Sequence, residues 1–147
     1  MMPSHGGANR STNDSSCVLQ VCAGTDCALL TGDISRRREA ELVRDCGSRL
    51  RSRVLLVPHH GSNSSSSSVF LDQVRPELAL VSAGYFNRFR HPSAAVVRRL
   101  QDRGIRVLVT ASTGTQWVRL GNRPMLSCWR DRCRGWWRRQ QKLPDRL

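Results

Sequence analysis

This sequence contains no long apolar segment and no N-terminal stretch typical of a secretory signal peptide. No apolar run approaches the roughly 20 residues that a membrane-spanning helix needs. The first residues, MMPSHGGANRSTND, lack the basic start and apolar middle of a secretory signal. We therefore expect no membrane span within these 147 residues and a disordered leader over residues 1–12.

Lysine is nearly absent as well. One lysine stands against 23 arginines and 11 acidic residues, which leaves a net charge of +13. A surplus of this size favours a polyanionic partner, either a nucleic acid or an anionic membrane surface. An arginine bias also arises from genome base composition, so the charge supports a nucleic-acid partner without proving one.

Cysteine pairs of the C-x-x-C type are lacking, which excludes a zinc knuckle and a thioredoxin-like redox pair. We expect the cysteines at 17, 22, 27 and 46 to be small buried hydrophobes, because they fall in strand-like or apolar helical sequence. Cys128 and Cys133 lie in a basic segment and are expected to be exposed, with a metal or disulfide role as the lesser alternative.

The rest of the sequence alternates strand-like and helix-like segments, which predicts an α/β layer structure. A Gly-Thr-Asp turn separates the first two strand-like stretches and predicts a hairpin. The expected helices run from an N-cap at Ser35 to about Cys46, near 69–74, and from Pro92 in a first turn to Gly104. The expected strands are 17–21, 27–31, 53–58, 78–83, 105–110 and 115–120.

These elements predict one domain over residues 13–120, followed by a basic tail. Residues 121–147 hold eight positively charged side chains and three tryptophans with no clean period. Arginine interleaved with tryptophan suits stacking on bases, contact with a membrane interface, or packing back on the domain edge. The three alternatives for this tail stay open.

Three polar clusters follow predicted strands, and three of the four histidines lie in them. Ligands of open α/β sheets collect at the carboxyl ends of the strands. Aspartate and histidine suit zinc, manganese or iron, so the clusters predict a metal site. The plainer interpretations are a turn aspartate, a histidine before a helix and a flexible serine linker. The clusters are Thr31–Asp33, Pro58–Ser62 and Asn87–Pro92.

Two adjacent histidines, His59 and His60, stand in the second cluster. Adjacent residues of an extended chain point in opposite directions, so only one of the two is expected to face a metal. The other is expected to orient the site or to point at substrate. Gly61 lets the backbone turn away directly after them.

Phosphate-binding groups are expected on both sides of the histidines. Ser62 and Ser64, with the backbone amides at the start of the following helix, are expected to cradle a phosphate. Asn87, Arg88 and Arg90 precede another helix, and arginine binds phosphate with two parallel hydrogen bonds. We expect both loops to hold the same nucleic-acid backbone.

The segments LLTGD, VLLVPHHGSNSSSS and VSAGYFNRFRHP, in this order, resemble the C-terminal part of the metallo-β-lactamase-like domain of ComEC-type DNA-internalisation competence proteins. The resemblance covers residues 13–120. It implies the second half of a four-layered αββα sandwich, in which helices flank a mixed sheet, and a nuclease activity during the uptake of transforming DNA. The implied partners are DNA, the missing first half of the domain and the channel region of the parent protein in the inner membrane. An exposed sheet face would also favour self-association.

The resemblance also implies residue roles. By position, Asp33 corresponds to the family's metal-bridging aspartate and His60 to its terminal histidine ligand, with His59 close behind. His91 corresponds to a histidine that binds substrate phosphate, metal or the leaving group. The implied catalytic residues are thus Asp33, His60 and His91, and the implied cofactor is a divalent metal, zinc or manganese.

The family's main ligand cluster, a His-x-Asp-x-Asp-His or His-x-His-x-Asp-His segment, is missing from this sequence. His5 stands alone in the leader. Asn13 and Ser16 correspond to the polar residues that precede the hairpin in the family. We therefore expect a fragment with an incomplete site, little or no hydrolysis by itself and weak, salt-sensitive DNA binding. Two alternatives are a non-catalytic DNA-binding or assembly module and part of another metallo-β-lactamase-fold hydrolase.

Overall fold

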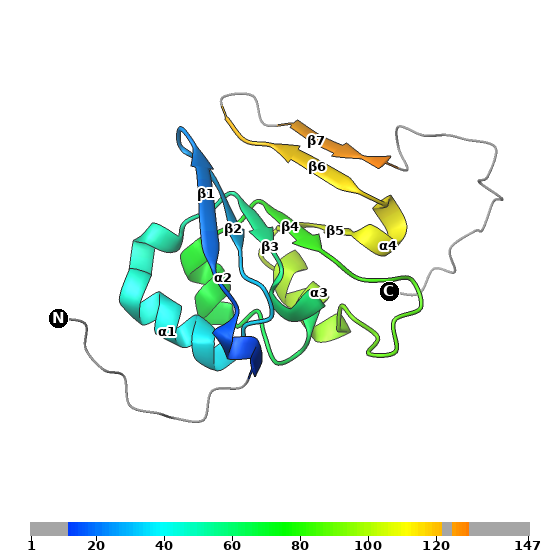
Figure 1. The fold of residues 1–147 in the computed structure, drawn as a ribbon, viewed down its shortest axis with the longest axis horizontal. Helices are drawn as coiled ribbons and strands as arrows, with labels where there is room; N and C mark the ends of the chain where they lie inside the picture. Colours follow the sequence, from blue (N-terminus) through cyan, green and yellow to red (C-terminus); the bar gives the residue numbers. More distant parts are fainter. Residues whose placement is uncertain (1–11, 122–124, 130–147) are drawn as a thin grey trace.

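A five-stranded mixed sheet forms the centre of the fold (Figure 1). The computed structural model describes residues 12–121 and 125–129. The strand order is β1-β2-β3-β4-β5, with β1 antiparallel to β2 and the other neighbours parallel. The predicted α/β alternation is confirmed. The strands are β1 (Leu19–Ala23), β2 (Asp26–Leu30), β3 (Val54–Leu56), β4 (Leu78–Val81) and β5 (Arg106–Val109).

The predicted hairpin is present as β1 and β2, although β1 begins two residues later than expected. Cys22 and Cys27 lie directly opposite each other in this hairpin and form a disulfide. Cys17 is exposed. The expectation that these three cysteines are buried hydrophobes was therefore wrong. The reason is register, because the antiparallel pairing brings the Cα atoms of Cys22 and Cys27 to 4.1 Å at the exposed edge of the sheet.

Three helices connect the strands: α1 (Arg36–Cys46), α2 (Ser68–Val74) and α3 (Ala94–Gln101). The first two match their predicted ranges closely. The last begins later than predicted, since Ser93 is its N-cap and the Ser93 hydroxyl accepts a hydrogen bond from the Val96 amide. Pro92 therefore lies before the helix and not in its first turn. A short turn, η2 (Gly47–Leu50), follows α1.

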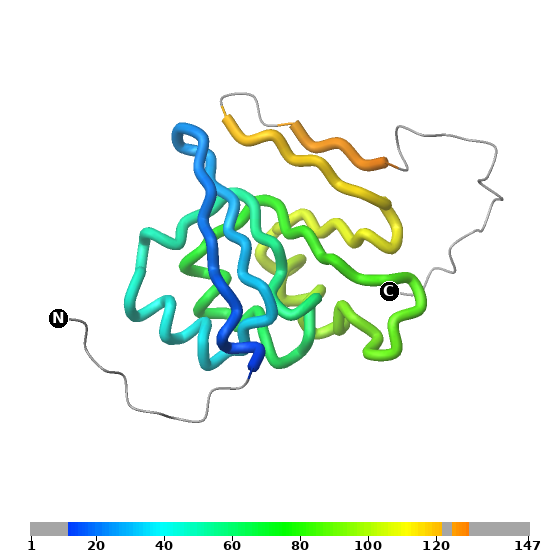
Figure 2. The backbone as a smooth tube through the Cα atoms, viewed as in Figure 1, coloured from blue at the N-terminus to red at the C-terminus, as the bar shows by residue number. Residues whose placement is uncertain are grey.

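The core lies between the helices and one face of the sheet. Figure 2 shows the backbone of the helical segments running beside the strands. Leu29, Leu55 and Ala79 occur in register on β2, β3 and β4, and each is at most 1% exposed. From the helices, apolar side chains pack against them. These are Leu42, Phe70, Leu71, Val74, Val96 and Leu100.

The opposite face of the sheet carries a second apolar row. Successive strand residues point to opposite faces, so the residues that follow the core positions point away from the helices. They are leucines on every strand, and we call them the leucine row: Leu19, Leu30, Leu56, Leu80 and Leu108, each paired with the next. Leu19 is 53% exposed and Leu30 is 38% exposed. The described residues therefore leave at least the β1 and β2 end of this row open to solvent.

A separate two-stranded sheet follows β5 and the short helix α4 (Thr110–Thr113). The predicted last strand is present as β6 (Gln116–Arg119), but it pairs with β7 (Met125–Cys128) instead of joining the main sheet. Sequence analysis placed these residues in the basic tail and expected no strand there. Cys128 is 5% exposed, so its expected exposure was wrong, because β7 pairing turns this residue inward.

Some predictions concern residues that the structure does not describe. These are residues 1–11 of the predicted leader 1–12, and residues 122–124 and 130–147 of the predicted tail 121–147, which include Cys133. Among the described residues, no helix has the length and apolarity needed to cross a membrane.

Candidate functional site

Four loops meet at one edge of the main sheet. Strands β2 to β5 are parallel, so their carboxyl ends lie on the same side. Thr31, Pro58, Ser82 and Thr110 each lie just beyond one of these ends. The loops that carry the three predicted polar clusters therefore start from a common edge.

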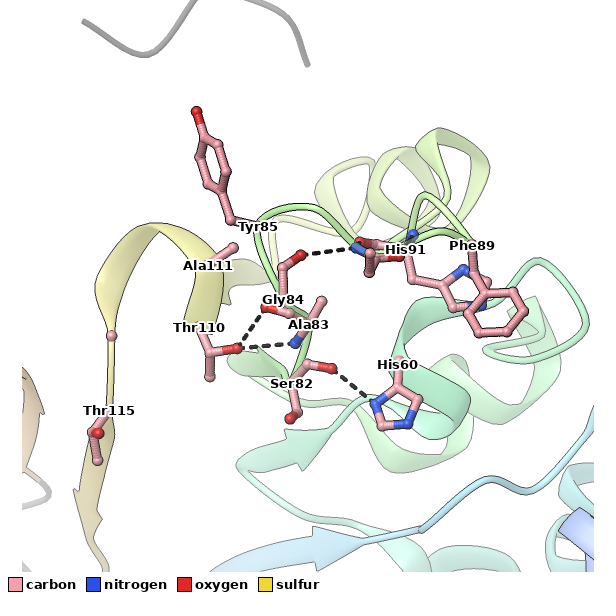
Figure 3. A pocket seen from close by; sticks show the side chains of 12 residues that line it. His60, Ser82, Ala83, Gly84, Tyr85, Phe89, His91, Thr110, Ala111 and Thr115 are labelled. Carbon is pink, nitrogen blue, oxygen red and sulfur yellow. Dashed lines mark hydrogen bonds between the residues drawn. The ribbon is translucent and has the colours of Figure 1, made fainter. Parts of the chain in front are cut away.

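Asp33 and His60 are brought together at this edge. The Asp33 Oδ1 atom lies 3.5 Å from His60 Nε2, and the side chains are 41% and 50% exposed. His60 Nδ1 donates a hydrogen bond of 2.8 Å to the Ser82 carbonyl oxygen (Figure 3). A carbonyl only accepts, so Nδ1 carries a proton, and Nε2 is the ring atom that faces the carboxylate. Nε2 and a carboxylate oxygen at this distance interact favourably with a proton or a metal cation between them.

His59 points to different partners. Its Nε2 lies 3.4 Å from the Asn13 amide nitrogen, which donates, and its Nδ1 lies 3.4 Å from the Ser64 hydroxyl. Its ring centroid is 6.1 Å from that of His91. The geometry therefore favours His60 over His59 as the neighbour of Asp33.

The side chains of His59 and His60 point in different directions, but for a different reason from the one predicted. They do not lie in extended chain but in the turn η3 (Pro58–Gly61), where both have positive φ values, 51° for His59 and 55° for His60. The premise of an extended chain was wrong. The His59 amide donates to the Gly32 carbonyl at 3.0 Å, which ties this turn to the loop that carries Asp33.

Asp33 is positioned by the segment that precedes the hairpin. Ser16, just after the turn η1 (Thr12–Ser15), accepts a hydrogen bond of 3.1 Å from the Asp33 amide through its hydroxyl. The Asp14 carboxylate accepts the Ser35 amide at 2.9 Å, so the start of α1 is held by the same turn. Ser16 and Asp14 therefore hold the backbone of the loop that carries Asp33 by hydrogen bonds.

His91 lies near His59 and is held through its backbone. The Asn87 side chain accepts from the His91 amide at 2.7 Å and donates to the His91 carbonyl at 2.8 Å. The His91 Nδ1 atom is buried without a hydrogen-bond partner among the described residues. Burial lowers the pKa of the His91 imidazole, and nearby His59 and His60 lower it further.

The serine run is an ordered loop whose amides are already engaged. The carboxylate of Glu39, which is fully buried, accepts the amides of Ser66 and Ser67. Arg99 donates to the Ser65 and Ser66 carbonyls. The amides of Ser66 and Ser67 are thus engaged by an internal carboxylate and are not free to bind a phosphate, whereas phosphate binding by Ser62 and Ser64 stays a prediction. Neither the role of Glu39 nor that of Arg99 was predicted, since a helical sequence does not reveal which charge is buried.

The hydroxyl and arginine groups predicted to hold phosphate lie at the rim of the site. Ser62 Oγ and Ser64 Oγ are 3.0 Å apart, and Ser64 reaches His59. Arg88 lies over the Phe89 ring, with 4.6 Å from its guanidinium carbon to the ring centroid. Arg90 is exposed and has a positive φ of 53°. Their binding of DNA stays a prediction.

An open pocket of about 760 Å³ adjoins His60 and His91 (Figure 3). The loop after β4 contributes Tyr85 and Phe89, and α4 contributes Thr110, whose hydroxyl bonds to Ala83. Sequence analysis did not single out these aromatic and hydroxyl groups. The signal available was the cluster Tyr85, Phe86 and Phe89 in a loop of a chain that is only 5% aromatic.

The Asp33 and His60 pair fits two positions of a divalent metal site. Ligand atoms bound tetrahedrally at about 2.0–2.1 Å from zinc lie about 3.4 Å apart, close to the 3.5 Å between Asp33 Oδ1 and His60 Nε2. However, no three His, Cys, Asp or Glu side chains in the described part of the chain are arranged to hold a metal. The described residues thus offer one pair of candidate ligands and not a full set.

The fold and this edge define an α/β protein with an acid–histidine pair beside an open pocket. Known proteins carry closely similar sequence. The chain is 46% identical over 113 residues to competence protein ComA of Neisseria gonorrhoeae and 41% identical over 113 residues to ComE operon protein 3 of Bacillus subtilis. It is 38% identical over 110 residues to recombination protein 2 of Haemophilus influenzae. The chain belongs to the family of ComEC-type competence proteins.

The matches cover most of this chain but little of each relative. They include 77%, 77% and 75% of the chain, and 16%, 14% and 14% of the three relatives. No family model matches the chain. The relatives therefore support a role related to competence, and the activity of the whole proteins enters below as a proposal.

Proposed function

We propose that the chain carries part of a metal-dependent phosphodiesterase site of a competence protein that takes up transforming DNA. The Asp33 and His60 pair is the observation that carries this proposal, because an imidazole Nε2 and a carboxylate oxygen, both groups that bind divalent metals, face each other at 3.5 Å on an open edge. The net charge of +13 supports a polyanionic substrate. The names of the competence relatives support the link to DNA uptake.

In this proposal the side chains have separate tasks. Asp33 and His60 bind zinc or manganese, and the Ser82 carbonyl keeps the proton on His60 Nδ1 so that Nε2 stays available. Such a metal lowers the pKa of bound water and neutralises charge on a phosphate. Arg88 and Arg90 hold the DNA backbone near the pair. His91, close to His59, contacts the same phosphate.

The site is completed from outside the described residues. A catalytic metal takes about three protein ligands and keeps one position open, whereas the described residues provide two. The leucine row supports a second layer, since an apolar sheet face of this kind packs against another sheet or helix. The proposal therefore retains the second half of a metallo-β-lactamase-like αββα sandwich. The first half and a channel in the inner membrane belong to the longer parent protein.

Metal titration calorimetry tests the ligand pair. Zinc and manganese are added to the chain, to Asp33→Asn and to His60→Gln, with His59→Gln as the matched control. Both site variants should lose metal affinity, and the control should keep it, because His59 faces Asn13 and Ser64. Equal affinity in all three variants would contradict the pair. DNA binding without any metal binding would favour a non-catalytic module instead.

Hydrolysis tests whether the site is incomplete. The isolated chain should cleave DNA slowly or not at all in either metal, since two ligands leave the ion poorly held. Its DNA binding should weaken steeply as salt rises, because arginine contacts release counterions. Rapid metal-dependent cleavage that is lost in Asp33→Ala would show that the chain completes the site by itself.

A further inference from the structure

The loop Tyr85–His91, which we call the aromatic loop, exposes aromatic rings next to the candidate site. Phe86 is 93% exposed, Phe89 is 63% exposed and Tyr85 is 47% exposed. Exposure of several large apolar side chains in one short loop costs solvation free energy and marks an interaction site. The loop joins β4 to α3 and starts at the same sheet edge as His60.

The loop is held in a fixed conformation by one side chain. Asn87 donates to the Gly84 carbonyl at 2.9 Å and to the His91 carbonyl at 2.8 Å, and it accepts from the His91 amide. These bonds join the two ends of the loop, near Gly84 and at His91, through the Asn87 side chain. The rings therefore face solvent from a braced loop and do not depend on a bound partner for their position.

The planar groups of the loop lead toward the candidate site. The Arg88 guanidinium lies 4.6 Å from the Phe89 centroid, and the Phe89 ring is stacked on His91 at 5.7 Å and 17°. His91 in turn lies 6.1 Å from His59. On the other side, Phe86 meets Tyr85 edge to face at 4.6 Å, which leaves the Phe86 ring almost entirely open.

We propose that the aromatic loop is a stacking platform that selects single-stranded DNA. Phe86 and the Arg88 guanidinium each offer a flat surface to an unpaired base, and the pocket beside Tyr85 and Phe89 receives the next nucleotide. Bases of a duplex are stacked on their neighbours and offer no free face, whereas bases of a single strand do. The inference rests on the proposed function, since it takes DNA as the ligand of that site.

The surroundings of the loop favour DNA over a membrane surface. A membrane-anchoring loop needs only apolar side chains at its tip and basic side chains behind it. Here the rings continue into a pocket lined by His60, His91 and Thr110, which offer hydrogen bonds to phosphate and base edges. Contact with an anionic membrane remains the competing outcome of the test.

Fluorescence anisotropy with the full chain tests the proposal. Three labelled probes of equal length are compared at one salt concentration: a single strand, its blunt duplex and a strand of abasic sites that keeps all phosphates. We expect the single strand to bind tighter than either of the others. Phe86→Leu should weaken single-strand binding roughly tenfold and leave binding of the abasic strand unchanged. Phe86→Trp should retain it.

Controls separate this inference from the function on which it rests. Val69→Ala removes an apolar side chain that is 65% exposed on α2 and should leave all three affinities unchanged. Equal binding of duplex and single strand, unaffected by Phe86→Leu, would overturn the stacking platform while the metal-dependent site stands. Loss of binding to phosphatidylserine vesicles in Phe86→Ala, with unchanged binding of the single strand, would overturn it in favour of a membrane contact. Absence of binding to any DNA probe would overturn both proposals.

Discussion

The carboxylate of Glu39 accepts the backbone amide of Ser67 at 2.8 Å and also that of Ser66. Glu39 is on α1 and the serines precede α2, so a fully buried acid fixes the loop that follows the paired histidines. Arg99 on α3 binds the carbonyls of the same loop. The serine run is thus fixed by buried hydrogen bonds from two helices, and it supports the turn that carries His59 and His60.

Glu39→Gln should therefore destabilise the chain by about 1.5–3 kcal/mol, because the amide group of glutamine places a donor against a buried backbone donor. Urea unfolding followed by circular dichroism measures this free energy. Glu77→Gln is the matched control, since Glu77 is 69% exposed where it pairs with Arg53. A surface pair contributes about 0–1 kcal/mol. Equal losses in the two variants would contradict the framework role.

Gly61→Ala should destabilise the chain more than Gly24→Ala does. Both glycines have positive φ values, 80° and 62°, so both substitutions carry a backbone cost of about 1–2 kcal/mol. At Gly61 the added Cβ would also lie 2.6 Å from the Pro92 Cβ, whereas at Gly24 nothing lies within 4 Å. Thermal unfolding of the two variants should show the larger loss for Gly61→Ala. Equal losses would mean that the turn shifts without cost.

Acid should weaken the fold through His91. Burial lowers the folded-state pKa of His91 below the ordinary 6.5, so the unfolded chain binds a proton more readily. Stability should fall as pH drops below about 6.5 and should level off below the folded-state pKa. Urea unfolding at several pH values, with a chelator present, measures this slope. His91→Gln should flatten it, and parallel profiles for the two proteins would contradict the prediction.

The leucine row should drive self-association of the isolated chain. Leu19→Gln with Leu30→Gln should shift the chain toward monomer, because these two leucines are exposed at the open end of the row. Size-exclusion chromatography with light scattering measures the mass. Val69→Gln, on the helical side at α2, is the control and should leave the mass unchanged. A wild-type monomer at all concentrations would contradict this prediction.

Sequence reasoning identified the elements well where the signal was local. Ser35 and Gly47 flank α1 as predicted, and the hairpin, β3, β4 and β5 lie within or close to their predicted ranges. It could not identify the disulfide, since spacing alone does not show that Cys22 and Cys27 fall opposite each other. It also could not place β6, which has ordinary strand sequence but pairs with β7.

The candidate site shows the same division. The order of the motifs predicted that Asp33, His60 and His91 belong to neighbouring loops. The backbone of η3 decided which histidine faces the acid, because left-handed residues turn the two rings apart in a way that an extended chain does not. The stacking of Phe89 on His91 also depends on how the loop folds back through Asn87.

By itself the sequence determined the alternation of strands and helices, the caps and the polar residues at strand ends, because each depends on side chains within a few positions of one another. Only the tertiary structure decided that Glu39 occupies the Ser66 and Ser67 amides, that His60 and not His59 meets Asp33, and that the β1 and β2 end of the leucine row lies open. These features depend on the register and packing of segments far apart in the chain. Local periodicity carries no information on which distant surfaces meet.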